Sequence, residues 1–241
     1  MQAELQKLRK QLSEILVSDK ALKQALREVN KMDIIKASLI VRNPKHQEVK
    51  VGEILEGQLQ KDVPVGDYLF IQNACEAVKM AYNNIEMGNG VDGNLLKSAY
   101  RILTEEQDSG YRTDNPVVYN FNHVPPHCAD IEERVNRSCR KIYDEQFEDD
   151  VIAKAMYIHN AIIDIWPFAD FNGEIAIFAM NYYLMEQGLM PIDMPMDRQD
   201  YFDLVASCLK GLRPDEEYAF IKDAVFQKMQ GAIAVCQSVS K

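Results

Sequence analysis

The chain has 241 residues, 47% of them hydrophobic and 27% charged, which suffices to bury a full core as one domain with an appendage. Its formal net charge of -10 argues against nucleic acid as a partner, because clustered Lys and Arg supply most of that affinity. Without a stretch of 18 apolar residues or a signal peptide, we expect a cytoplasmic protein that makes no membrane contact, and leave export by another route open. The five cysteines form no Cys-x-x-Cys pair, which is typical of reduced thiols.

The N-terminal segment carries an apolar stripe at helical spacing. Apolar residues recur at steps of three and four from Leu5 to Leu16, and again at Leu22, Leu26 and Val29, which predicts amphipathic helices. We expect this stripe to pack on the chain's own domain, and the alternative is a short coiled-coil seam that would give a homodimer. The sequence is therefore divided into N-terminal helices at residues 1–34 and a main domain at residues 35–241.

The rest of the chain reads as helices with one exception. The strand-like run is Tyr111 to Asn122, where β-forming residues lie among turn residues and predict a short hairpin. The segment from Val151 to Ile165 is nearly apolar all round, which predicts a buried central helix. The fold class is therefore all-α with one hairpin. Helices are predicted at residues 52–60, 66–85, 92–104, 128–146, 150–164, 174–187, 198–210 and 214–236.

A distinctive loop joins two of the predicted helices. Residues 166–177 read Trp-Pro-Phe-Ala-Asp-Phe-Asn-Gly-Glu-Ile-Ala-Ile. This stretch resembles the signature of the Fic (Fic/Doc) family, His-Pro-Phe-x-Asp-Gly-Asn-Gly-Arg-x-x-Arg, and the resemblance implies a Fic-like helical bundle. The positions that match are Pro167, Phe168, Asp170, Asn172 and Gly173. The His, the first Gly and the two Arg positions hold Trp166, Phe171, Glu174 and Ile177.

Other segments resemble the family in the expected order. Gly110–Thr113, with the two prolines at 125–126, is similar to the family's Gly-x-Tyr-Arg segment and its flap hairpin, which docks a target. The resemblance implies a protein partner that docks on the flap at Tyr111, Arg112, Val117, Val118 and Tyr119. His159 resembles a His often found in the family's central helix, and Arg198 to Leu204 resembles the helix after the signature loop. We expect His159 to be a hydrogen-bonded core residue.

Residues 38–43 resemble the inhibitory motif of Fic proteins that carry their inhibitor N-terminally, Ser/Thr-x-x-x-Glu-Gly/Asn. Ser38 and Asn43 match it, whereas Arg42 stands at the position of the inhibitory Glu. The resemblance implies an inhibitory helix near residues 35–45. Because Arg42 and Glu174 both reverse the family's charge, we predict that Arg42 lies within salt-bridge distance of Glu174 or Asp170.

Active Fic proteins transfer AMP from ATP to a protein hydroxyl, and the residues of this loop are poorly suited to that reaction. The indole of Trp166 only donates hydrogen bonds, so it cannot replace the His as general base. Glu174 repels phosphate where the family holds an Arg, and Ile177 removes the second cation. Phe171 carries a steric penalty in the conformation that Gly adopts freely.

Three residues keep part of the family's chemistry. Asn172 and Gly173 at a helix start form a remnant of an anion site. Asp170 matches the acid that binds Mg²⁺, yet one carboxylate without phosphates is a weak metal site and serves equally well as a turn residue or helix cap. The aromatic residues Trp166, Phe168 and Phe171 are read as a plug over the core.

The sequence thus predicts a pseudoenzyme, a protein-binding or regulatory module on a Fic fold. We expect no cofactor, since ATP and Mg²⁺ are implied by the family resemblance alone. The alternative is a divergent transferase that uses another phosphorylated donor, or one with residual adenylyltransferase activity.

Overall fold

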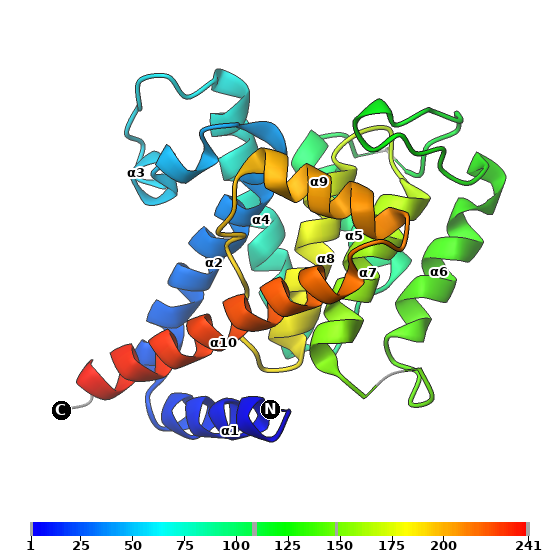
Figure 1. Ribbon diagram of the computed structural model, residues 1–241. Helices are drawn as coiled ribbons and strands as arrows, with labels where there is room; N and C mark the ends of the chain where they lie inside the picture. The colour runs from blue at the N-terminus through cyan, green and yellow to red at the C-terminus, as the bar shows by residue number, and fades with distance from the viewer. Residues whose placement is uncertain (1, 108–109, 148, 240–241) are drawn as a thin grey trace.

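The computed structural model describes residues 2–107, 110–147 and 149–239, and in these residues it is helical throughout (Figure 1). Ten α-helices and three short 3-10 helices are found there. The α-helices are α1 (Gln2–Ser18), α2 (Lys20–Arg42), α3 (Val51–Leu55), α4 (Val65–Glu86), α5 (Gly93–Thr104), α6 (Ile131–Lys141), α7 (Val151–Ile165), α8 (Asn172–Glu186), α9 (Arg198–Leu209) and α10 (Pro214–Val239). The 3-10 helices are η1 (His46–Glu48), η2 (Tyr119–Phe121) and η3 (Cys128–Asp130). None of these helices combines the length and hydropathy needed to span a bilayer.

Helices α1 and α2 are separated by a single residue. Asp19 has extended backbone angles, φ -136° and ψ 101°, and its side chain accepts a hydrogen bond from the N–H of Leu22, which starts α2. α1 then lies across the base of the molecule and packs against α10 and α2 (Figure 1). Because α2 runs without interruption from residue 20 to residue 42, it crosses position 34, where the sequence was divided in two. That division stays a prediction.

Helix α8 is the most deeply buried helix, and not α7 as the sequence predicted. Every residue from Asn172 to Leu184 is buried, because α2, α4, α5 and α7 all pack around α8. In α7 the buried residues lie mainly on one face, and Asp164 is exposed. An apolar composition all round a helix therefore identified a core element but did not rank the two neighbouring helices, since the ranking depends on how many others surround each one.

The predicted hairpin at residues 111–122 is wrong: the described part of the chain contains no β-strand. One isolated antiparallel bridge joins Val118 to His123, with Val118 N–H bonded to His123 C=O at 2.9 Å and His123 N–H to Val118 C=O at 3.2 Å. Between them the chain turns through η2 and closes with Asn122 in the left-handed region. This tight turn buries Phe121 in the core, so the β-forming residues serve packing in place of strand pairing.

Candidate functional site

The part of the signature loop between α7 and α8, residues 166–171, begins and ends with an aromatic residue in the left-handed region. Trp166 has φ 49° and ends α7, where its N–H bonds to the C=O of Ile162 at 2.8 Å. Phe171 has φ 56° and immediately precedes α8. A non-glycine residue in this conformation costs about 1–2 kcal/mol, so contacts around the loop must hold it in place.

Asn172 supplies one of these contacts. Its side-chain oxygen accepts a hydrogen bond from the N–H of Phe168, and its side-chain nitrogen donates to the C=O of Phe168, both at 2.9 Å. The Phe168 ring is fully buried and stacks on Tyr100, with the ring centroids 4.3 Å apart. The side-chain amide of Asn172 thus closes the loop on itself, while the anion-site remnant expected from the backbone N–H groups of Asn172 and Gly173 stays a prediction.

Arg112 clamps the loop from the outside. Its backbone N–H donates to Pro167 C=O at 2.9 Å, and its guanidinium donates to the carbonyls of Trp166 at 2.7 Å, Pro126 at 2.7 Å and Ile165 at 3.3 Å. The residue is only 5% exposed. With its donors occupied by carbonyls, the Arg112 side chain is placed to shape the loop and not to meet a target on the surface.

The other predicted flap residues divide between core and surface. Val118 is buried, and Tyr111 packs its ring against Phe168 with centroids 5.5 Å apart. Val117 and Tyr119 are 47% and 87% exposed. Only these last two therefore stand where a partner could touch them.

Asp170 is held by a tyrosine. The hydroxyl of Tyr100 donates to a carboxylate oxygen of Asp170 at 2.8 Å, and burial together with this carboxylate raises the pKa of Tyr100. In the residues that the structure describes, no group of three His, Cys, Asp or Glu side chains is placed to hold a metal ion. Asp170 thus acts in this arrangement as a hydrogen-bond acceptor that fixes the loop to α5.

His159 of α7 lies in the protein core. One ring nitrogen is 3.0 Å from the hydroxyl of Tyr201, and the other is 2.9 Å from the side-chain oxygen of Asn160. The residue is buried, and both of its nitrogens have partners. It is a hydrogen-bonded core histidine, as expected, and does not offer a base to the loop.

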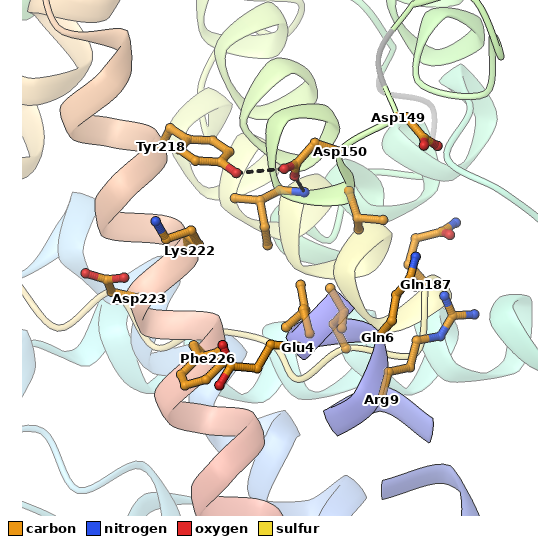
Figure 2. A pocket seen from close by; sticks show the side chains of 14 residues that line it. Glu4, Gln6, Arg9, Asp149, Asp150, Gln187, Tyr218, Lys222, Asp223 and Phe226 are labelled. Atoms are coloured by element: carbon orange, nitrogen blue, oxygen red, sulfur yellow. Dashed lines mark hydrogen bonds between the residues drawn. The ribbon is translucent and has the colours of Figure 1, made fainter. Parts of the chain in front are cut away.

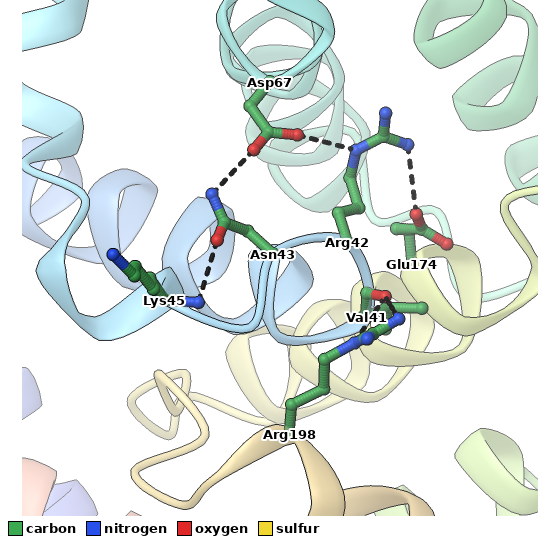
Figure 3. A network of polar contacts seen from close by, with 7 residues as sticks. All are labelled: Val41, Arg42, Asn43, Lys45, Asp67, Glu174 and Arg198. Carbon is green, nitrogen blue, oxygen red and sulfur yellow. Dashed lines mark hydrogen bonds and ion pairs between the residues drawn. The ribbon is translucent and has the colours of Figure 1, made fainter. Parts of the chain in front are cut away.

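The end of α2 meets the start of α8 through Arg42 (Figure 3). One terminal guanidinium nitrogen lies 3.3 Å from a carboxylate oxygen of Glu174, so the contact predicted from the two reversed charges is present. Nε lies 3.5 Å from Asp67 of α4, a second partner that the sequence did not indicate. The guanidinium carbon also stands 4.8 Å from the ring centroid of Phe70 and 5.0 Å from that of Phe171. Arg42 is therefore enclosed by two carboxylates and two aromatic rings.

Neighbouring residues fasten the same helix end. The Asn43 side chain donates to Asp67 at 2.8 Å and accepts from the N–H of Lys45 at 2.8 Å, and Arg198 of α9 donates twice to the C=O of Val41, at 3.2 and 3.0 Å (Figure 3). The Ser38 hydroxyl donates to the C=O of Ile34 within its own helix. The segment that resembles an inhibitory motif is thus docked by residues from three other helices.

Val41 closes the space in front of α8. A Cβ atom added to Gly173 would lie 3.0 Å from both γ-methyl groups of Val41, so only glycine allows this approach of α2. Ile177, one turn further along α8, is fully buried. Five cavities formed by residues 2–107, 110–147 and 149–239 have no residue of the signature loop in their lining.

Burial raises the pKa of Glu174 above its ordinary value of 4.5, although its own backbone N–H and Arg42 both act to lower it. An acid whose pKa is raised by folding adds stability below its unfolded pKa and loses that contribution as the pH rises through its folded pKa. From about pH 4.5 upward, the protein should therefore lose unfolding free energy relative to a Glu174→Gln variant, whose amide does not titrate.

The measurement is urea unfolding of both proteins at closely spaced pH values from about 4 to about 8. The stability difference should move in favour of Glu174→Gln over the window that begins near 4.5. Parallel curves, or a wild type that gains relative stability with rising pH, would contradict a buried carboxylate whose desolvation outweighs its pairing.

Comparison with known proteins agrees with this geometry. Residues 91–184, which contain the signature loop and its clamps, match the family model described as Fic/DOC family. These residues are therefore similar to a Fic/DOC domain. The chain is 30% identical over 109 residues to the protein adenylyltransferase Fic of Nematostella vectensis, and the match covers 40% of this chain and 23% of that relative.

Solved structures show that this Fic/DOC fold extends beyond the matched residues. A Fic domain containing signaling protein from Bacteroides thetaiotaomicron superposes with a TM-score of 0.77 at 14% identity, covering 97% of both chains. A Fic-1 fragment from C. elegans gives a TM-score of 0.72 at 17% identity, covering 99% of this chain and 74% of that one. A Fic family protein from Desulfovibrio desulfuricans G20 gives 0.68 at 19% identity, covering 96% of this chain and 74% of that one. At these identities the likeness concerns the fold.

Proposed function

We propose that this chain is a Fic-fold protein that does not transfer AMP and works as a protein-binding or regulatory module. The observation that carries the proposal is Arg42, which stands before the first turn of α8 in contact with Glu174 and Asp67. In the family to which the loop is similar, this helix start is where an ATP triphosphate would be held. Here a cation of the chain's own faces a carboxylate of the chain's own.

The nucleotide implied by the family does not fit these residues. At about 5 Å and an effective dielectric near 20, each unit of charge changes an interaction by about 3 kcal/mol, and Glu174 replaces a cation, a change of two units. The positive end of a helix dipole returns only about 0.3–1 kcal/mol. Val41 against Gly173 and the ring of Phe171 beside Arg42 occupy the approach as well. We therefore route no reaction step through ATP or Mg²⁺.

The acceptor side supports the same proposal. The Trp166 indole can donate a hydrogen bond but cannot take a proton from an attacking hydroxyl. General base catalysis typically contributes about 10² to 10⁴-fold, so its loss alone would leave a slow reaction. Asp170 accepts the Tyr100 hydroxyl on one carboxylate oxygen, a contact that fixes it to α5.

A protein partner is the occupant that we propose for the exposed side of this region. Val117, Tyr119 and Val124 are 47%, 87% and 72% exposed on the segment that follows Arg112. The proposal of a protein partner does not rest on main-chain pairing at a hairpin edge, because both backbone groups of Val118 bond to His123. We propose that the partner instead contacts these exposed side chains. We also propose that the protein is located in the cytoplasm and that it forms a homodimer.

The proposal is tested by nucleotide-dependent thermal stabilisation of the full chain. ATP, GTP, CTP and UTP, each with Mg²⁺, should leave the melting temperature unchanged. A ligand at a hundredfold its dissociation constant would add about 2.7 kcal/mol and raise the melting temperature measurably. Stabilisation by ATP would overturn the proposal, and stabilisation by another of these nucleotides would favour a transferase with a different donor.

A further inference from the structure

A cavity of about 380 Å³ lies between α1, the start of α7, the segment that follows α8, and α10 (Figure 2). The cavity lies at the start of α7, whereas the signature loop follows the end of this helix. Because α7 spans 15 residues, or about 21 Å, the cavity is remote from that loop. Its size falls within the range of about 300–1,000 Å³ usual for small-molecule sites. The cavity is therefore large enough for a ligand and separate from the site described above.

The walls of this cavity are largely apolar. Leu5 of α1, Ile152 of α7 and Leu189, which follows α8, line it together with Phe226 of α10, which is labelled in Figure 2. Ile152 and Leu189 are buried, whereas Leu5 and Phe226 are partly exposed. An apolar body placed here would be covered by side chains from α1, α7 and α10 and from the segment that follows α8.

Carboxylates outnumber cations around the cavity. Lining residues include Glu4, Asp149, Asp150 and Asp223 against Arg9 and Lys222. Asp150 is committed, because it accepts hydrogen bonds from the N–H groups of Ile152 and Ala153 and from the hydroxyl of Tyr218.

Two of the carboxylates keep their charge available. Neither Glu4 nor Asp223 forms an ion pair with a residue that the structure describes. Glu4 comes from α1 and Asp223 from α10 (Figure 2). They stand at the edge of the apolar cavity, where they can meet a charged group without being buried with it.

We propose that this cavity binds a small organic amine with an apolar body. The apolar walls take the body, while Glu4 and Asp223 attract the ammonium group, and the ring of Phe226 offers it an aromatic face. The net charge of -10 draws a cation toward the chain and repels an anion. The occupant is thereby distinguished from an acid of the same size and from a neutral alcohol.

Three probes with one aromatic body separate these classes: 2-phenylethylamine, 2-phenylethanol and phenylacetate. Each is titrated into the full chain and followed by two-dimensional amide NMR. The amine should shift resonances of α1, α10 and the start of α7, and bind about threefold to fivefold more tightly than the alcohol, with phenylacetate weakest. Equal or tighter binding of phenylacetate, or no binding of any probe, would overturn the proposal.

Variants locate the site. Glu4→Gln should weaken the amine about threefold and leave the alcohol unchanged, whereas Glu14→Gln, on the same helix but not among the residues that line the cavity, should change neither. Leu5→Phe should fill the cavity from the side of α1 and weaken the binding of all three probes together. Equal effects of the two glutamate changes, or unaltered binding in a folded Leu5→Phe variant, would show that the probes bind elsewhere.

Discussion

Restoring the missing base by Trp166→His should leave the protein without detectable AMP transfer. The substitution returns an imidazole whose pKa lies near working pH and with it a factor of about 10² to 10⁴. The charge reversal at Glu174 remains, and by the estimate of about 3 kcal/mol for each unit it opposes each phosphate charge by about 6 kcal/mol, or more than 10⁴-fold. The electrostatic deficit is thus larger than the gain.

Intact-mass spectrometry after incubation with ATP and Mg²⁺ is the measurement, in a preparation shown to contain no other Fic enzyme. Trp166→Phe is the matched control, since it changes the same position without adding a base. If Trp166→His acquires robust transfer and Trp166→Phe does not, the missing base limits the reaction and our ranking of the two effects is wrong.

Replacing Arg42 and Glu174 with alanine, singly and together, should reveal a coupling of about 1–3 kcal/mol in the free energy of unfolding. Arg42→Ala alone should cost about 3 kcal/mol, because it leaves Glu174 and Asp67 as buried carboxylates without their cation. Glu174→Ala should cost less, since Arg42 keeps Asp67 and the two aromatic rings. The double variant should therefore be more stable than the sum of the two single changes predicts.

Urea unfolding of the four proteins at neutral pH gives this coupling. The exposed pair Arg213–Glu216 serves as a control, because such i,i+3 pairs contribute only about 0.2–0.5 kcal/mol. A coupling below about 0.3 kcal/mol for Arg42–Glu174, within the additivity error of independent sites, would mean that the contact does not hold α2 to α8. The raised pKa of Glu174 does not conflict with a large coupling, since burial penalises the carboxylate while Arg42 still attracts it.

Periodicity located most helices within a few residues of their ends. The predicted helices at residues 66–85, 198–210 and 214–236 correspond to α4, α9 and α10, since each has a repeating apolar face and a proline or glycine beside it. The N-terminal pattern was followed only to Val29, whereas α2 continues to Arg42. Its last turns are buried on several sides, so the amphipathic signal fades where the helix enters the core.

The Arg42–Glu174 contact was predictable because both residues reverse a charge at positions that the family places in one site. Asp67 and Phe70 were not, since nothing in their local sequence relates α4 to the end of α2.

The sequence by itself determined that the described part of the chain is helical, where the signature loop lies, and which of its positions hold side chains other than the His and the two Arg of the signature. Those properties depend on residue type and spacing alone. Only the tertiary structure decided that α8 is the central helix, that Arg112 clamps the loop, and that Val118 and His123 bond to each other in place of a hairpin. These outcomes depend on which distant segments share the core, because burial and hydrogen-bond partners are set by packing between helices and not by any short stretch of residues.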